Sequence, residues 1–120
     1  MLVAGTLRAT LPGPEFTLSW EHSVEKIEWT ERYAVEGDRL RLVEARVGGF
    51  GAGMEPARDA TLQSGAWTWQ PASPPLPELR LTYSTFTRDY RLCAATRCAA
   101  LAEIAAPLAD GDVVTVRACP

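Results

Sequence analysis

The sequence predicts a single β domain over residues 1–120, either an antiparallel β-sandwich or a small, partly closed barrel of about seven to nine strands. Three observations lead to this fold class. A length of 120 residues fits one domain, and 47% hydrophobic with 22% charged residues is ordinary for a globular protein. Apolar and polar residues alternate along much of the chain, which is typical of half-buried antiparallel strands. Proline and glycine clusters separate these stretches, as turns require.

The strands can be placed in order along the chain. Residues 2–10 form a first strand that ends before Pro12-Gly13-Pro14. Alternation predicts later strands at residues 16–24, 27–35, 40–44, 79–83, 90–92 and 114–116. Residues 48–59 and the proline-rich residues 70–77 are expected to be irregular. An alanine-rich segment at residues 97–106, followed by Pro107, predicts one short C-terminal helix.

Two turns set the expected pairing of the strands that follow Pro14. Gly37-Asp38 is a favourable two-residue turn. Its register sets Glu36 against Arg39, Val35 against Leu40, Tyr33 against Leu42, Glu31 against Glu44 and Trp29 against Arg46. A turn at Glu25-Lys26, which has poorer turn residues, sets Val24 against Ile27, His22 against Trp29 and Trp20 against Glu31.

This register gathers polar side chains on the apolar face of three adjacent strands. The cluster consists of His22, Glu31, Glu44 and Arg46, surrounded by Trp20, Trp29, Tyr33 and Leu42. Two carboxylates on directly opposite residues repel each other unless one is protonated or a cation or ligand lies between them. Ser23 points to the face opposite His22, so the two side chains do not form a nucleophilic pair.

Three interpretations of this cluster remain open. In the first, Arg46 and protonated His22 neutralise the two glutamates in a purely structural network. In the second, the cluster lines a pocket for a ligand or substrate. In the third, His22, Glu31 and Glu44 bind a divalent metal ion, although the guanidinium of Arg46 argues against a cation there.

A glycine-rich segment follows the strand that carries Glu44 and Arg46. The segment ends at Met54 and has glycines at positions 48, 49, 51 and 53. These glycines allow backbone amides to converge on an anion. The segment lacks the lysine and hydroxyl residue of a phosphate-binding loop. It either closes over the polar cluster or serves as an irregular crossover between sheets.

The three cysteines are confined to the last 28 residues. They lack the spacing of a zinc site, since His22 is the sole histidine. A disulfide between Cys98 and Cys119 is favoured because it would tie down the C-terminus. Cys93 with Cys119 is the rival pairing, and three reduced, half-buried cysteines are the third alternative.

Composition also limits the classes of partner that the protein is expected to bind. A net charge of −3 with no basic stripe predicts no nucleic-acid binding. No stretch approaches the roughly 20 apolar residues of a membrane span. The first five residues are too short for an export signal. We expect a monomer without a cofactor.

Several motifs resemble a bacterial family of unknown function. They are Phe16-x-Leu18-x-Trp20-x-His22-Ser23-Val24-Glu25-Lys26, Trp29-x-Glu31-x-Tyr33, Leu40-x-Leu42-x-Glu44 and Gly51-Ala52-Gly53-Met54. Members of that family are small exported proteins, often encoded beside TRAP transporters of the TAXI type. The resemblance implies an extracytoplasmic, periplasmic location and an export signal missing from this sequence. It implies no established activity.

These observations favour a non-enzymatic accessory or solute-binding module of a TRAP-type uptake system. Its partner would be a small carboxylate solute, suited to Arg46 and the glycine-rich amides, or a membrane subunit of the transporter. The candidate ligand-binding residues are His22, Ser23, Glu31, Glu44, Arg46, Gly51, Gly53 and Met54. One alternative is a small hydrolase or lyase in which Glu31, Glu44 and His22 act as acid and base. Another is a purely structural assembly domain.

Overall fold

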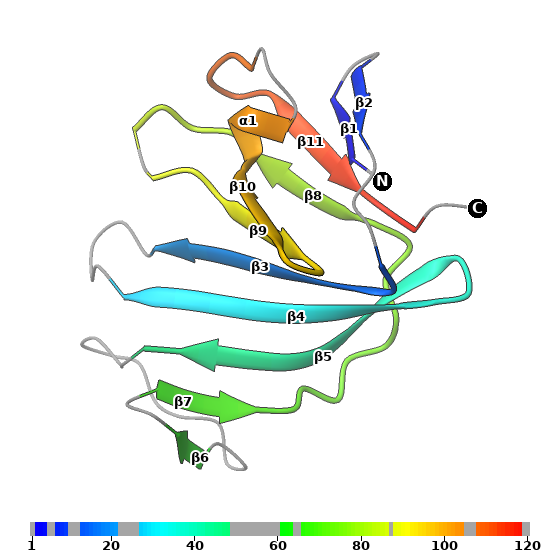
Figure 1. The fold of residues 1–120 in the computed structure, drawn as a ribbon, viewed down its shortest axis with the longest axis vertical. Coiled ribbons are helices and arrows are strands. Elements are labelled where there is room, and N and C mark those ends of the chain that lie inside the picture. Colours follow the sequence, from blue (N-terminus) through cyan, green and yellow to red (C-terminus); the bar gives the residue numbers. More distant parts are fainter. Residues whose placement is uncertain are drawn as a thin grey trace.

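Two antiparallel sheets build the protein, as the computed structural model shows for residues 2–4, 7–9, 13–21, 27–48, 61–63, 66–86, 88–104 and 108–118 (Figure 1). The small sheet has the order β2-β1-β11-β8 and the large sheet the order β10-β9-β3-β4-β5-β7-β6. The small sheet contains β1 (Leu2–Ala4), β2 (Leu7–Ala9), β8 (Leu79–Thr82) and β11 (Val113–Val116). The large sheet contains β3 (Glu15–Glu21), β4 (Glu28–Glu36), β5 (Arg39–Val47), β6 (Thr61–Gln63), β7 (Ala66–Trp69), β9 (Arg91–Ala94) and β10 (Arg97–Ala100).

The predicted fold class is confirmed. The described residues are mostly β, and they form two antiparallel sheets that do not close into a barrel and one short helix, α1 (Leu101–Ile104). Of the strands in the described residues, eight have four or more residues, and β1, β2 and β6 have three. Within the part of the chain that the structure describes, no helix is long and apolar enough to span a membrane.

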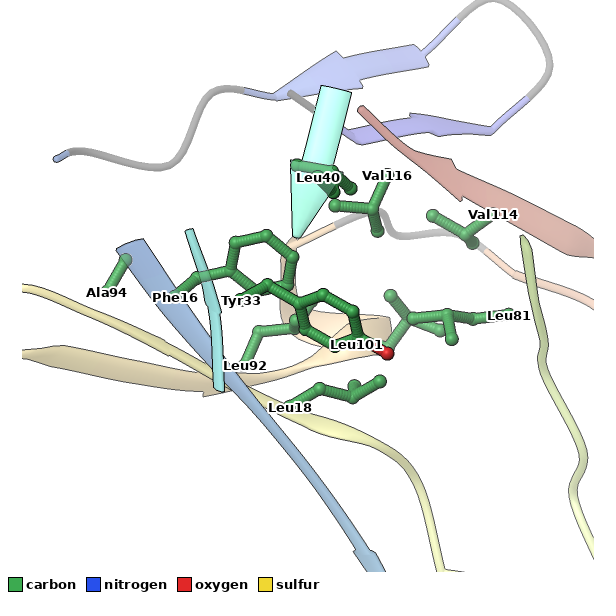
Figure 2. Packing of buried hydrophobic residues seen from close by; sticks show 10 residues of the cluster. All are labelled: Phe16, Leu18, Tyr33, Leu40, Leu81, Leu92, Ala94, Leu101, Val114 and Val116. Atoms are coloured by element: carbon green, nitrogen blue, oxygen red, sulfur yellow. The ribbon is translucent and has the colours of Figure 1, made fainter. Parts of the chain in front are cut away.

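The hydrophobic core lies where the small sheet and α1 pack against the β9-β3-β4 part of the large sheet (Figure 2). Leu92, Leu101, Val114 and Val116 are at most 1% exposed and come from three different elements, β9, α1 and β11. Burial of each such side chain contributes roughly 1.5–3 kcal/mol. The core therefore joins the two sheets through residues from both halves of the chain.

The proline-rich segment between β7 and β8 is fixed to β5 at one point. Leu76 and Leu40 exchange two backbone hydrogen bonds, of 2.8 and 2.7 Å, in an isolated antiparallel bridge. Leu40 is 1% exposed and belongs to the core. The segment thus passes from one sheet to the other along β5 (Figure 1).

The β4–β5 hairpin follows the predicted register only near its turn. Gly37 adopts a positive φ of 64°, and Glu36 faces Arg39, Val35 faces Leu40 and Tyr33 faces Leu42, as predicted. The register then shifts between Tyr33 and Arg32, so that Arg32 faces Glu44 and Val43 is an extra residue in β5. Beyond this β-bulge Glu31 faces Ala45, and Trp29 faces Val47. The predicted pairs Glu31–Glu44 and Trp29–Arg46 are therefore wrong.

The β3–β4 pairing also differs from the prediction. Trp20 faces Trp29 and Leu18 faces Glu31, instead of Trp20 facing Glu31 and His22 facing Trp29. The last pair is Glu21 with Glu28, which leaves six residues, 22–27, between the strands. The prediction centred the connection between Glu25 and Lys26, whereas the observed connection is centred one residue earlier, between positions 24 and 25, and this moves every pair by two positions.

Two further expectations are corrected at the chain ends. Residues 2–10 form two short strands rather than one, since Leu2 faces Ala9 and the chain reverses between them. Of the predicted helix at 97–106, Leu101–Ile104 form α1, whereas residues 97–100 form β10 and pair with β9, and residues 105–106 lie outside the described residues. Alanine favours helices in isolation, but pairing within the sheet outweighs that preference.

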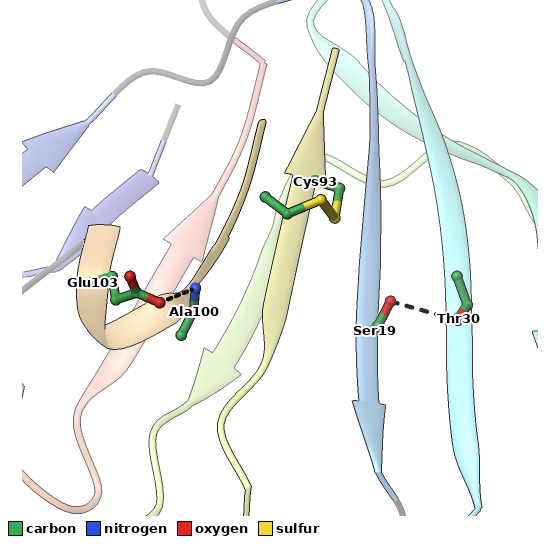
Figure 3. The surroundings of a disulfide bond; sticks show 6 residues. Ser19, Thr30, Cys93, Ala100 and Glu103 are labelled. Atoms are coloured by element: carbon green, nitrogen blue, oxygen red, sulfur yellow. Dashed lines mark hydrogen bonds between the residues drawn. A yellow bond between two sulfur atoms is a disulfide. The ribbon is translucent and has the colours of Figure 1, made fainter. Parts of the chain in front are cut away.

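The β9–β10 hairpin is closed by a disulfide between Cys93 and Cys98, which face each other across the pair (Figure 3). The favoured Cys98–Cys119 bond and the rival Cys93–Cys119 bond are both wrong, and Cys119 lies outside the described residues. A two-residue turn at Ala95-Thr96 sets the register, with Ala94 opposite Arg97, and so makes the two cysteines neighbours. Side chains of directly opposite residues are close enough to bond.

A tryptic digest under non-reducing conditions tests this disulfide, because Arg91, Arg97 and Arg117 separate the cysteines. For protein made in an oxidising compartment, we expect peptide 92–97 to be linked to peptide 98–117. Mass spectrometry measures the linked mass, and the same digest after reduction is the control. A link between peptides 98–117 and 118–120 would instead demonstrate a Cys98–Cys119 bond and contradict the structure.

Candidate functional site

One face of the large sheet, here called the inner face, carries both the core and the candidate site. Phe16 and Leu18 of β3 and Tyr33 of β4 point from this face into the core (Figure 2). Side chains alternate between the two faces along a strand. Trp20, Trp29 and Glu31 therefore also lie on the inner face, in line with those core residues.

Four aromatic side chains form a continuous row on the inner face: Tyr90, Trp20, Trp29 and Trp69, here called the aromatic row. Adjacent ring centroids are 6.2, 6.2 and 6.3 Å apart. Trp20 and Trp29 are nearly parallel, at 9°, whereas Trp29 and Trp69 meet edge to face at 84°. Such contacts fix ring orientation and stabilise the fold by ~0.5–1.5 kcal/mol each beyond burial. All four side chains are half-buried, so each keeps part of its surface in solvent.

The sheet register brings these rings together. Trp20 and Trp29 are directly opposite on β3 and β4, and Trp69 faces Ala45 on β5. Trp20 and Tyr90 pack against the core, which holds one end of the row in place. The aromatic row is therefore anchored by the same strands that form the core.

Glu31 is the charged residue beside the row. It faces Leu18 on one side and Ala45 on the other. The Tyr33 hydroxyl donates a hydrogen bond of 2.9 Å to Glu31 Oε1. Among the ion pairs of the described residues, none involves Glu31. A half-buried carboxylate is thus held by a neutral donor, with no cation from the described chain beside it.

The hydroxyl of Tyr33 is strongly biased towards its protonated form. Burial raises the pKa of the Tyr33 phenol above its usual range, and the carboxylate of Glu31 raises it further. Because the phenol keeps its proton, it acts as a hydrogen-bond donor rather than as a base. This bond also fixes the direction of the Glu31 carboxylate.

Glu44 and Arg46 do not join Glu31. Because of the β-bulge at Val43, both lie on the opposite, outer face of the large sheet, where Glu44 faces Arg32 and Arg46 faces Thr30. Glu44 is 3.6 Å from the guanidinium of Arg32, and Arg46 is exposed. The predicted cluster of polar residues on one apolar face is therefore wrong for Glu31, Glu44 and Arg46.

The other predicted site residues lie outside the described residues. They are His22, Ser23, Gly51, Gly53 and Met54. Within the described ranges, no group of three histidine, cysteine or carboxylate side chains could hold a metal ion.

The outer face contains a shallow depression of about 340 Å³ beside the disulfide-linked hairpin. Its lining comes from Gly13, Pro14, Glu15, Phe16, Thr17, Arg32, Cys93 and Ala95. Arg32 could attract an anion there, but its guanidinium is already 3.3 Å from Glu15 and 3.6 Å from Glu44. The charge of the arginine is compensated, which makes this depression the weaker candidate.

The sequence predicts Glu31 as a candidate ligand-binding residue and Trp20 and Trp29 as its apolar surroundings, but it does not predict Trp69 and Tyr90 beside them. The stretch Ala66-Trp67-Thr68-Trp69 alternates as a strand does, and this signal could have placed Trp69 on a sheet face. The sequence predicts a strand at Tyr90 but indicates no partner strand for it. Its contact with Trp20 depends on the pairing of β3 with β9, which is 70 residues distant in sequence and has no local signal.

The fold and the site together define a small β protein with a disulfide-linked hairpin and an aromatic sheet face beside a single carboxylate. The chain belongs to the family described as Domain of unknown function (DUF1850), whose family model matches residues 16–101. No curated protein and no solved structure matches the chain significantly. The matched region includes the whole aromatic row, Glu31 and both cysteines of the disulfide.

The hydrogen bond between Tyr33 and Glu31 predicts a pH-dependent effect of Tyr33→Phe. At pH 7 the variant should lose ~1.5–3 kcal/mol of unfolding free energy, as for a bond to a charged group. The folded-state pKa of the phenol is raised, so its contribution is complete below about pH 10 and declines above it, where the unfolded chain loses its proton first.

Urea denaturation of wild type and Tyr33→Phe at pH 7 and pH 11 measures this effect. The difference in stability between the two proteins should be smaller at pH 11. Tyr83→Phe, directly after the end of β8, is the matched control. A difference that stays constant with pH would contradict the assigned hydrogen bond.

Trp29→Phe is expected to cost little stability. Among the described side chains, the indole nitrogen of Trp29 is the one buried polar atom without a hydrogen-bond partner. An unpaired buried donor costs roughly 1–3 kcal/mol, and its removal offsets the lost apolar contact. We expect a change within about 1 kcal/mol for Trp29→Phe and a clear loss for Trp20→Phe. Equal losses in thermal or chemical denaturation would show that the Trp29 indole N–H is satisfied.

Proposed function

We propose that this protein is a non-enzymatic, solute-binding accessory module that works outside the cytoplasm with a TRAP-type uptake system. The observation that carries the proposal is the aromatic row beside Glu31 on the inner face. Half-buried tryptophans next to one oriented polar group are typical of binding sites rather than of structural surfaces.

Binding is favoured over catalysis by the isolation of Glu31. The hydrolase or lyase alternative needs an acid and a base that both reach the reacting atoms. Glu44 lies on the outer face, and Tyr33, the residue hydrogen-bonded to Glu31, retains its proton. The described residues around Glu31 therefore provide recognition without an acid–base pair.

Two observations support an extracytoplasmic location and the association with a transporter. The Cys93–Cys98 disulfide fits an oxidising compartment, since such bonds are rare in reducing ones. The association rests on the resemblance of the motifs around residues 16–54 to exported proteins encoded beside TAXI-type TRAP transporters. Arg46 lies on the outer face, which removes it from the binding of a carboxylate solute at the aromatic row.

Solute binding is tested by following the indole N–H signals in NMR spectra while small periplasmic solutes are added to the purified protein. A binding solute should shift the signals of Trp20, Trp29 and Trp69. Trp69→Phe should weaken binding at least fivefold, whereas Arg46→Ala on the outer face should leave it unchanged. A solute that binds without shifting the signals of Trp20, Trp29 and Trp69 would show that the aromatic row is not the binding site.

The transporter partner is tested separately by co-purification with TAXI-type TRAP subunits from the same organism. We expect the tagged protein to retain at least one of these subunits after washing at physiological salt. A tagged, unrelated periplasmic protein is the control. Failure to retain any subunit would refute the transporter association while leaving solute binding intact.

A further inference from the structure

We infer that the aromatic row and Glu31 together bind a small organic cation, an ammonium group that carries methyl or other alkyl substituents. This inference rests on the proposed solute-binding function and specifies the ligand class for the same site. It depends on the charge of Glu31, on the orientation of the rings and on the spacing between them.

The negative charge of Glu31 favours a cationic ligand. Its carboxylate is half-buried on an apolar face, and the described residues supply a neutral donor, Tyr33, but no ion pair. β4 and β5 carry four arginines, Arg32, Arg39, Arg41 and Arg46, and their pairing places all four on the outer face. A ligand cation would therefore meet a carboxylate that is already oriented and carries no compensating charge.

The rings select the kind of cation. The face of a tryptophan ring is negative, so cations near it are attracted, and alkylated ammonium groups lose less hydration there than a bare ammonium. Trp29 and Trp69 meet at 84°, so the row presents ring planes in two directions. This arrangement allows a roughly spherical group to contact more than one aromatic surface.

The spacing places the carboxylate and the rings within reach of one small ligand. Glu31, Ala45 and Trp69 lie in one cross-strand line on β4, β5 and β7. Neighbouring strands are about 4.8 Å apart, so Glu31 and Trp69 are separated by roughly 10 Å along the backbone plane. The intervening residue, Ala45, contributes only a methyl group, and Trp29 lies two residues before Glu31 on the same face.

Comparison of choline with its uncharged isostere 3,3-dimethylbutan-1-ol tests the inference directly. Both ligands have the same shape, and only choline is charged. In calorimetric or NMR titrations of the wild-type protein we expect choline to bind at least tenfold more tightly. Comparable affinity of the two ligands, or binding of neither, would overturn the organic-cation assignment without depending on any variant.

The role of Glu31 is tested by Glu31→Gln, with Glu44→Gln on the outer face of the adjacent strand as the matched control. Glu31→Gln should weaken choline binding at least fivefold and leave the neutral isostere unaffected, whereas Glu44→Gln should change neither. Thermal denaturation monitors folding of both variants. Unchanged choline affinity in folded Glu31→Gln would exclude the carboxylate from the site.

The same titrations separate this inference from the proposed function. If an uncharged sugar shifts the indole signals and choline does not, solute binding stands and the ligand class is wrong. If choline binds but the transporter subunits are not retained, the cation site stands and the partner is wrong. If neither choline nor any other solute shifts the indole signals, both the cation site and the solute-binding function fail.

Discussion

The composition of the inner face depends on the register between β4 and β5, and one extra residue in β5 sets that register. Val43 has no partner of its own in the pairing, so every later residue of β5 faces the side opposite to the one that strict alternation gives. Ala45 and Val47 turn inward and are almost fully buried, while Glu44 and Arg46 turn outward. Without the bulge, two carboxylates and a guanidinium would share the apolar face with the four tryptophans Trp20, Trp29, Trp67 and Trp69.

Local sequence determines much of the fold, but not the features that define the site. Alternation around Phe16, Tyr33 and Leu40 predicts paired strands with an inward face, and Gly37-Asp38 predicts the turn correctly. A bulge has no comparable signature, because Val43 is as good a strand residue as its neighbours. The sequence does not predict the Cys93–Cys98 disulfide, because the alanines after Arg97 favour a helix there. In the structure Arg97–Ala100 instead form β10, which pairs with β9. The ring contact between Tyr90 and Trp20 depends on the pairing of β3 with β9, two segments far apart in the sequence.

The candidate site and the core are parts of one surface. Trp20 and Tyr90 pack against core residues on one side and continue the aromatic row on the other. Tyr33 is 4% exposed within the core, yet its hydroxyl reaches Glu31 at the edge of the site. The rings and the carboxylate are consequently positioned by rigid strands and by buried side chains. Such a site needs little rearrangement when a ligand arrives, which favours affinity because less freedom is lost on binding.

The bridge between Leu40 and Leu76 has a consequence for the solubility of the protein. β7 pairs with β5 only from Ala45 to Val47, so the earlier part of β5 has a side that another chain's strand could join. The segment that runs along this side contains Pro74, Pro75 and Pro77, and proline has no N–H to offer to a further strand. Leu76 satisfies the backbone of Leu40, while its neighbours cannot template additional pairing. The proline-rich segment between β7 and β8 thereby protects this edge of β5 against association with other molecules and aggregation.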